Sequence, residues 1–253
     1  MVCLRAERGF AVTLRRLHVV DLPTGGGAVI LDDVASRHVR VLRLQPGDQV
    51  ELFDGEGRAA EARVESIGET VVCVAQGARQ VTIRRARLVL VLGLPKGAKL
   101  DACVRMATEL GVDEIALLRA ERSVPRWEPT RVQAKLERLN RIAAEAAAQS
   151  ERADVPTIHA PRACDEVLQA FPDQAHGVVC AARARDTLDL PETPTELWCA
   201  IGPEGGFSPD EVAAFEAARF RVASLGATIL RVDTAVVAAL TLLRDRVDAV
   251  QAR

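Results

Sequence analysis

The last third of the chain contains two segments in which a short apolar run leads into a glycine turn and then into the start of a helix. In the first, the apolar run 197–201 is followed by Gly-Pro-Glu-Gly-Gly-Phe and then by Ser-Pro-Asp-Glu. An apolar run of five residues has the length of a buried strand. Ser208 is expected to cap a helix, with Pro209 at the first helical position and Glu211 completing a capping box. This segment therefore predicts a strand–loop–helix unit.

The second segment repeats the same order around Gly226. Residues 222–225 are expected to form a strand, and Thr234 is expected to cap a helix over 235–247. Open α/β sheets bind ligands beyond the carboxyl ends of their strands. The two turns therefore predict a small-molecule site at one edge of a sheet, although ordinary strand–helix connections would carry the same residues.

The first glycine turn indicates which ligands suit such a site. Gly205 and Gly206 allow a ligand to approach the main chain closely. The phosphate-binding patterns G-x-x-x-x-G-K-[ST] and G-x-G-x-x-G are absent from the sequence. Glu204 stands where a phosphate would need positive charge. A ligand with a cationic centre therefore suits this turn better than a phosphate.

The rest of the chain divides into a β-rich part and an α/β part. From residue 17 to about residue 83, short runs with period two alternate with glycine turns around one helix expected over 33–44. Further along, the expected strands are 88–93, 115–118 and 178–182, and the expected helices are 99–110 and a long helix capped by Thr130. These patterns predict a small β-barrel followed by an α/β domain with a mostly parallel sheet.

Composition narrows the classes of function. Aromatic residues make up 3% of the chain and tyrosine is absent, which argues against the stacking platforms that bind single-stranded nucleic acids. The net charge is −2, so any RNA would have to be bound by local basic patches. The six cysteines are widely spaced and predict free thiols in a reducing cytosol, with Cys73, Cys180 and Cys199 as small buried hydrophobes. No metal site and no membrane span are expected.

Five ordered motifs resemble those of the RsmE family, S-adenosylmethionine-dependent enzymes that methylate N3 of a uridine in bacterial 16S ribosomal RNA. The motifs lie at 38–48, at 94–101 with 107–112, at 147–152, at 201–211 and at 225–235, and the last two read Ile-Gly-Pro-Glu-Gly-Gly-Phe-Ser-Pro-Asp-Glu and Leu-Gly-x-x-Ile-Leu-Arg-x-Asp-Thr-Ala. The resemblance extends over roughly residues 16–245. The chain departs from the family's usual residues at Met106, Ala227, Thr228, Val232 and Asp233, which bear on substrate contact and leave the glycines in place.

The resemblance implies a fold, a cofactor and partners. It implies a variable extension over 1–15, a PUA-like RNA-binding β-barrel over 16–84 and a SPOUT methyltransferase domain with a trefoil knot over 85–253. It implies S-adenosyl-L-methionine bound in the knot loops, a homodimer in which two subunits build each site, and 16S rRNA or the small ribosomal subunit as the partner. A cytoplasmic location follows, and no membrane partner is expected.

The motifs also imply which residues hold the cofactor. The backbone of Leu225, Gly226, Ile229 and Leu230 is expected to bind adenine, and the first glycine turn to line the ribose and methionine part. The implied cofactor-binding residues are Ile201, Gly202, Pro203, Glu204, Gly205, Gly206, Leu225, Gly226, Ile229, Leu230 and Thr234.

Methylation at N3 also needs groups that act on the uracil. A fixed guanidinium would stabilise the deprotonated base. Arg152, in a matched motif, is the first candidate and Arg231 is the second, and both could equally contact phosphates. Glu204 is a third candidate catalytic residue, which would contact the ribose or lie near the sulfonium. The general base stays open between Asp233 and Glu204.

Candidate RNA contacts lie mostly in the N-terminal part. They are Arg16, His38, Arg40, Arg43 and Lys96. Arg40 and Arg43 are three residues apart on an expected helix and would share one face. A solvated helix face would carry the same pair.

Two other functions fit the same sequence. One is a SPOUT methyltransferase that acts on another RNA position, and the other is a non-catalytic RNA-binding factor in ribosome assembly. The final helix bears on assembly, because its apolar residues cover more than one side and predict a homodimer interface. These residues are Val236, Val237, Leu240, Leu243 and Val247.

Overall fold

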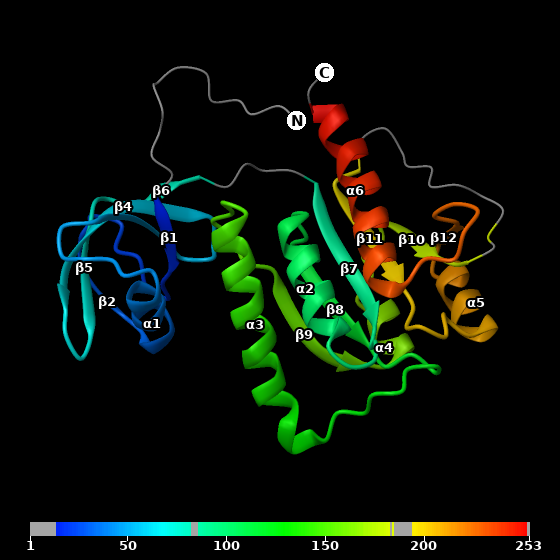
Figure 1. Cartoon of the computed structure of the whole chain (residues 1–253). Coiled ribbons are helices and arrows are strands. Elements are labelled where there is room, and N and C mark those ends of the chain that lie inside the picture. The colour runs from blue at the N-terminus through cyan, green and yellow to red at the C-terminus, as the bar shows by residue number, and fades with distance from the viewer. Residues whose placement is uncertain (1–13, 82–85, 183, 185–193, 252–253) are drawn as a thin grey trace. The chain divides into compact units, whose positions relative to one another are not determined.

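The computed structural model describes residues 14–81, 86–182, 184 and 194–251 (Figure 1). The chain folds into two compact units, Met1–Val81 and Thr82–Arg253. Most of the extension predicted over 1–15 lies outside the described residues, and the first strand begins at Arg15.

The N-terminal unit is built on a six-stranded sheet in the order β1-β3-β4-β5-β2, with β6 paired to β4. The strands are β1 Arg15–His18, β2 Gly27–Leu31, β3 Gln49–Phe53, β4 Arg58–Ile67, β5 Val71–Ala75 and β6 Arg79–Gln80. Residues with period two along these strands, including Val50, Leu52 and Cys73, form a buried core. Helix α1 (Asp33–Val41) contacts β1 and β2, the first and last strands of that order, so it lies against both edge strands of the sheet.

Helix α1 is shorter than predicted. Its start is capped by Asp32, whose carboxylate accepts a hydrogen bond from the Ala35 amide at 2.7 Å. Its last helical residue is Val41, and Arg43 adopts a left-handed conformation with φ 56°. Arg40 and Arg43 therefore do not share a helical face, because the chain has already turned away from the helix axis at Arg43.

The C-terminal unit contains a six-stranded sheet in the order β12-β10-β11-β7-β8-β9, and every pair in it is parallel. The strands are β7 Arg87–Gly93, β8 Glu114–Leu118, β9 Thr157–Arg162, β10 His176–Cys180, β11 Glu196–Ile201 and β12 Phe220–Ala223. The chain passes outward from β7 through β8 to β9 and then returns to build the other half of the sheet. The strand order therefore reverses between β7 and β11, and such a point is where α/β folds bind ligands.

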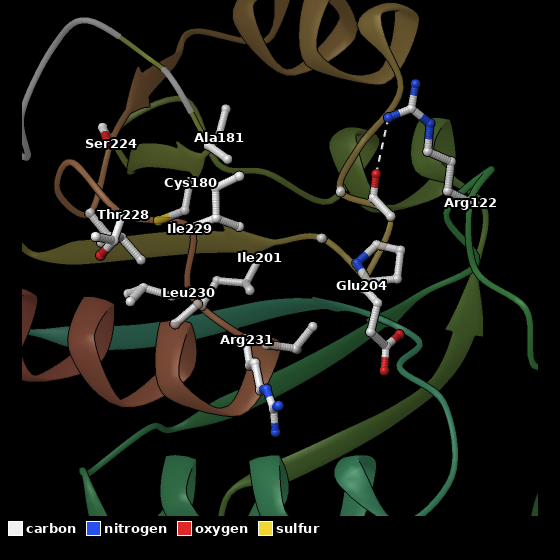
Figure 2. A pocket seen from close by; sticks show the side chains of 18 of the residues that line it. Arg122, Cys180, Ala181, Ile201, Glu204, Ser224, Thr228, Ile229, Leu230 and Arg231 are labelled. Carbon is white, nitrogen blue, oxygen red and sulfur yellow. Dashed lines mark hydrogen bonds between the residues drawn. The ribbon is translucent and has the colours of Figure 1, made fainter.

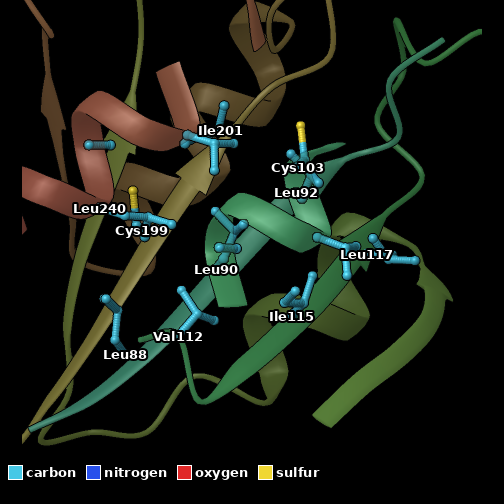
Figure 3. Packing of buried hydrophobic residues seen from close by; sticks show 14 of the residues in the cluster. Leu88, Leu90, Leu92, Cys103, Val112, Ile115, Leu117, Cys199, Ile201 and Leu240 are labelled. Carbon is cyan, nitrogen blue, oxygen red and sulfur yellow. The ribbon is translucent and has the colours of Figure 1, made fainter. Parts of the chain in front are cut away.

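Helices cover both faces of this sheet. On one face, α2 (Lys99–Glu109), α3 (Val132–Gln149) and α6 (Val232–Gln251) pack on every second residue of β7, β8 and β11 (Figure 3). On the other face, α4 (Cys164–Gln169) and α5 (Pro209–Ala217) pack on the alternate residues. Burial on both faces explains why β7 reads as a continuous apolar run in the sequence. A short 3-10 helix, η1 (Pro129–Arg131), precedes α3.

The helix starts confirm one predicted cap and correct two. Ser208 caps α5, and Glu211 completes the capping box, as predicted. Thr130 does not cap the long helix, because η1 occupies that position and α3 begins at Val132. Thr234 is not a cap either, since α6 begins at Val232 and places Thr234 inside its first turn.

The final helix, α6, exposes fewer of the apolar residues that were predicted to form a dimer interface. Val236, Leu240 and Leu243 are completely or almost completely buried in the core of their own unit. Val237 and Leu242 are the large apolar residues that stay exposed on the described part of α6. The side chain of Val247 lies outside the described residues. The apolar surplus for a second buried face is therefore smaller than predicted. The trefoil knot also stays a prediction, because part of the chain between β10 and β11 is outside the described residues.

Candidate functional site

A cavity of about 660 Å³ lies at the carboxyl ends of β10, β11 and β12 (Figure 2). Its volume falls within the range of roughly 300–1,000 Å³ that is typical of small-molecule sites. It is lined by Lys99, Arg122, Cys180, Ala181, Ala182, Ile201, Gly202, Pro203, Glu204, Gly205, Gly206, Ser224, Leu225, Thr228, Ile229, Leu230, Arg231, Val232 and Ala235. The two glycine segments thus form parts of one site.

The turn after β11 is closed so tightly that it needs glycine. A Cβ on Gly202 would lie 2.9 Å from the carbonyl carbon of Gly206 and from the amide nitrogen of Phe207. The Gly206 amide donates to the Pro203 carbonyl at 2.8 Å, and Gly206 itself has φ +68°. Because the contacts of Gly202 are to backbone, no side-chain rotation could relieve them. We refer to residues 202–207 as the glycine loop.

The opposite wall comes from the segment that joins β12 to α6. Ser224 closes its turn, since the hydroxyl donates to the Gly226 carbonyl at 2.9 Å and accepts from the Gly226 amide at 3.2 Å. Gly226 has φ +129°, a conformation that residues with a side chain rarely adopt. Leu225 and Leu230 are partly buried against the main core, whereas Ile229 is 71% exposed and borders the cavity in Figure 2. The apolar part of this wall, Leu225, Ile229 and Leu230, is therefore aliphatic.

Glu204 places a fixed negative charge at the edge of the cavity. Its carboxylate pairs with the Lys99 ammonium at 2.9 Å and accepts from the Lys96 amide at 3.1 and 3.2 Å. Partial burial alone would raise the pKa of this carboxyl, but the hydrogen bonds from Lys99 and from the backbone bring the pKa below its ordinary value. Glu204 is therefore ionised at neutral pH, in agreement with a site for a ligand that carries a cationic centre.

The predicted cofactor residues fall on this cavity with two exceptions. Gly226 and Thr234 are not among its lining residues, and the other predicted positions are. Sequence reasoning missed Lys99, Arg122, Cys180, Ala181, Ala182, Ser224, Thr228, Val232 and Ala235. The end of β10 could have been found, because a third strand end beside β11 and β12 belongs to the same edge of a parallel sheet.

Arg152 does not line the cavity. Its guanidinium is buried and donates to the carbonyls of Thr108 at 2.5 Å and Val112 at 2.9 Å, and it pairs with Asp154 at 2.5 Å. These contacts join the end of α2 and the loop before β8 to the segment that follows α3. The structure therefore gives Arg152 a structural role in its own subunit, and its action on the substrate stays a prediction.

Arg231, the second candidate, does line the cavity and is exposed. Figure 2 shows its side chain on the same side of the glycine loop as the Glu204 carboxylate. Asp233, a candidate general base, accepts a hydrogen bond from the Thr234 amide at 3.1 Å in the first turn of α6 and is not among the lining residues.

The candidate RNA contacts differ in how accessible they are. The side chain of Arg16 is 7% exposed, pairs with Glu51 at 2.6 Å and lies over the Phe53 ring, so it is a structural residue of the N-terminal sheet. Arg40 is exposed, but it donates to the carbonyls of Gly68 and Glu69 at 2.8 and 2.9 Å. Arg43 and Lys96 are exposed and His38 is half-buried, so these three stay available for contact with RNA.

Two of the cysteines meet at the cavity wall. Cys180 and Cys199 lie on neighbouring strands with their sulfurs 3.9 Å apart, and Cys180 lines the cavity instead of being a buried core residue. The hydrogen bond with Cys180 and complete burial raise the pKa of the Cys199 thiol. Among the described residues, no group of three or more potential ligands is arranged to hold a metal ion. Within the same described residues, no helix combines the length and the hydropathy that a membrane span needs.

Comparison with known proteins gives the same two-part division. The RNA methyltransferase domain family matches residues 83–244, and the RNA methyltransferase PUA domain family matches residues 31–74. The chain is 33% identical over 243 residues to ribosomal RNA small subunit methyltransferase E of Mycobacterium bovis, covering 88% of each chain. It is 28% identical over 244 residues to the protein of the same name in Bacillus subtilis, covering 92% of this chain and 94% of that one.

Solved structures agree with these relatives. A ribosomal RNA small subunit methyltransferase E from Neisseria gonorrhoeae, bound to S-adenosyl methionine, matches with a TM-score of 0.85 and 26% identity, covering 92% of this chain and 97% of that chain. A methyltransferase from Legionella pneumophila in complex with the same cofactor matches with a TM-score of 0.87 and 26% identity, covering 92% and 98%.

Proposed function

The chain belongs to the RsmE family of ribosomal RNA small subunit methyltransferases, and from this membership we propose that it transfers a methyl group from S-adenosyl-L-methionine to N3 of a uridine in 16S rRNA. The observation that carries the proposal is the single cavity between the glycine loop and the segment that joins β12 to α6.

The residues around the cavity suit this cofactor. The glycine loop leaves its backbone open to a ligand, because Gly202 and Gly206 have no side chains to fill the turn. The aliphatic wall at Leu225, Ile229 and Leu230 suits the apolar faces of an adenine. A charged sulfonium would be favoured by the ionised carboxylate of Glu204. The fit thus depends on backbone, apolar surface and the Glu204 carboxylate, which is held by Lys99.

The chain's own side chains divide the remaining work. The cofactor supplies an electrophilic methyl group when it is bound. Glu204 is better suited to hold a fixed negative charge than to accept a proton, since a carboxylate with a lowered pKa is a weak base. Arg231 is the guanidinium that we assign to the uracil oxygens, where it would stabilise the negative charge left after loss of the N3 proton.

The proposal extends to partners and location. His38, Arg43 and Lys96 would contact the small-subunit rRNA, with the N-terminal unit providing most of the RNA-binding surface. Assembly as a homodimer would use the exposed Val237 and Leu242 of α6. A protein that acts on ribosomal RNA in a bacterium would be found in the cytoplasm.

Two measurements test the proposed function. The modified nucleotides of 16S rRNA are mapped by mass spectrometry in a strain that lacks the gene, and the purified protein is then incubated with small subunits from that strain and labelled S-adenosylmethionine. We expect one N3-methyluridine to be missing in the strain and restored by the protein. Methylation at another position would favour a different RNA methyltransferase. Absence of cofactor binding would favour a non-catalytic RNA-binding factor.

A further inference from the structure

Arg122 connects the glycine loop to a distant part of the chain. It lies in the loop 119–128, which leaves the carboxyl end of β8 and leads to η1. One guanidinium nitrogen, Nη1, donates to the Gly205 carbonyl at 3.0 Å (Figure 2). The same nitrogen donates to the Phe207 carbonyl at 3.3 Å. These carbonyls stand on either side of Gly206, so a single nitrogen bridges the turn.

The stem of Arg122 also packs against the glycine loop. A Cβ on Gly205 would lie 3.1 Å from the Cβ of Arg122 and 3.4 Å from its Cδ. This spacing is close enough that any side chain at Gly205 would push the stem away. Glycine at position 205 therefore leaves room for the stem of Arg122 as well as for a ligand.

A second contact fixes the backbone beside Arg122. The Glu121 amide donates to Oε1 of Glu211 at 2.8 Å, while Oε2 of Glu211 accepts from the Ser208 amide at 2.8 Å. Glu211 is buried at the start of α5. The same carboxylate thus caps a helix and anchors the segment that carries Arg122, and this anchoring sets where the guanidinium can reach.

These contacts matter because a glycine-rich turn is intrinsically mobile. Glycine has more backbone freedom to lose than any other residue. Within the loop, the Gly206 amide closes one turn on the Pro203 carbonyl. The contacts from Arg122 act on two further carbonyls of the loop, Gly205 and Phe207, and order them before a ligand arrives. A loop that is ordered in advance binds more tightly, because less entropy is lost on binding.

We propose that Arg122 is a positioning residue, which holds the glycine loop in the conformation that receives S-adenosylmethionine. The inference rests on the proposed function for the identity of the ligand. It assigns Arg122 no contact with the reacting atoms. Its contribution should therefore be seen in cofactor affinity and in the mobility of the loop, while the rate at saturating cofactor changes little.

The test compares three variants of the full-length protein. Arg122→Met keeps an unbranched stem and removes the donors. Arg122→Lys keeps the charge and one donor nitrogen, but its ammonium does not have the planar donor directions of the guanidinium that reaches both carbonyls. Arg126→Met is the matched control, because Arg126 is an exposed arginine four residues further along the same loop. For each protein, the Kd for S-adenosylmethionine is measured by calorimetry, and kcat and KM for the cofactor are measured on small subunits.

For Arg122→Met we expect the Kd and KM for the cofactor to rise about tenfold, the loss expected when solvent-exposed, charge-assisted hydrogen bonds are removed, with kcat within about threefold of wild type. Arg122→Lys should show an intermediate rise, and Arg126→Met should match wild type. An unchanged Kd in Arg122→Met would overturn the proposal. A large fall in kcat with an unchanged Kd would also overturn it, because it would indicate a contact with RNA or with the transition state.

A second readout needs no ligand and separates this inference from the proposed function. Amide hydrogen exchange at Gly206 should be faster in Arg122→Met than in the wild type, because the turn loses its bridge. Equal exchange would overturn the positioning role. Wild-type protein that binds no S-adenosylmethionine would count against the proposed function alone. If Arg122→Met does not fold, Arg122→Lys provides the same comparisons.

Discussion

The two ends of the six-stranded parallel sheet are built in different ways. At the amino end, charged side chains connect neighbouring strands directly. Arg87 at the start of β7 pairs with Glu114 at the start of β8, and with Glu196 at the start of β11 at 3.1 Å. Glu196 also accepts from the Trp198 indole at 2.8 Å. Three strand starts are thereby held together by side-chain contacts.

At the carboxyl end, the main chain carries most of the contacts. Gly202 packs against backbone atoms, Glu204 accepts from the Lys96 amide, and Arg122 donates to the carbonyls of Gly205 and Phe207. These contacts surround a cavity instead of filling it. The same sheet thus has ion pairs between strands at one end and an open cavity at the other, and we expect the first to serve stability and the second to bind the ligand. A change at either end should therefore affect one property and spare the other.

The largest effect is expected from Gly202→Ala at the carboxyl end. The added Cβ would lie 2.9 Å from backbone atoms of Gly206 and Phe207, so the glycine loop would have to move. We expect the affinity for S-adenosylmethionine to fall about 100-fold, equivalent to roughly 3 kcal/mol, as measured by calorimetry. The melting temperature should change by less than about 4 °C, because the nearest atoms to the added Cβ are backbone atoms of the loop and not side chains of the core.

Gly25→Ala is the control for that experiment. Nothing lies within 4 Å of a Cβ at Gly25, which belongs to the N-terminal unit. This variant should bind the cofactor as the wild type does. Cofactor affinity that survives Gly202→Ala would remove the glycine loop from the site.

An intermediate effect, on stability instead of cofactor affinity, is expected from Arg87→Met at the amino end. The Glu114 side chain is 11% exposed and would lose its pairing with Arg87, which is itself 48% exposed and therefore partly screened by water. We expect the free energy of unfolding to fall by about 1 kcal/mol in a denaturant titration. The Kd for the cofactor should stay within about twofold of wild type. A loss of affinity as large as the loss of stability would break the separation between the two ends.

The smallest effect concerns the pH dependence of Glu204. The pKa of Glu204 is lowered because the hydrogen bonds from Lys99 and from the backbone outweigh the opposing effect of burial. The charge of Glu204 and its pairing with Lys99 therefore persist at neutral pH. The negative charge of Glu204 and its attraction to Lys99 are lost only as the pH falls through the lowered pKa of Glu204, which lies below the ordinary pKa of a glutamate. In Lys99→Met the pKa should rise, and cofactor binding should begin to weaken at a higher pH than in the wild type.

This shift is measured by calorimetry over a pH series. The effect at neutral pH should stay below about 1 kcal/mol, because the ion pair is partly exposed. Lys99→Met serves as the test and Lys96→Met as the control, since Lys96 contacts Glu204 through its backbone amide, which the substitution leaves in place. Identical pH profiles for wild type and Lys99→Met would show that Lys99 does not tune Glu204.

Much of the C-terminal fold could be predicted because its signals are local. The apolar run of β7, the glycine turn after β11 and the Ser208 cap each depend on residues that are adjacent in the sequence. The predicted start of β12, Val222, lies two residues after its true start at Phe220. The reason is a distant partner, since the Phe220 ring fills the space left by the missing side chain of Gly177 on β10.

The parts of the site that escaped prediction depend on contacts across long sequence separations. Arg122 and Gly205 are 83 residues apart, and no local pattern marks their hydrogen bond. Arg152 shows the converse, because its motif is visible in the sequence but the direction of its side chain is not. At this position Glu151 is left-handed and the Arg152 amide bonds to the Ala147 carbonyl, and the side chain reaches the carbonyls of Thr108 and Val112.

We expect S-adenosylmethionine to bind at the carboxyl end of the parallel sheet and at no other part of it. Amide hydrogen exchange of the wild-type protein with and without saturating cofactor tests this expectation most directly. Exchange should be slower in the glycine loop and in residues 224–232 when the cofactor is present, with no change at the first residues of β7, β8 and β11. Unchanged exchange in the glycine loop, or new protection centred on the amino end around Arg87 and Glu114, would contradict it.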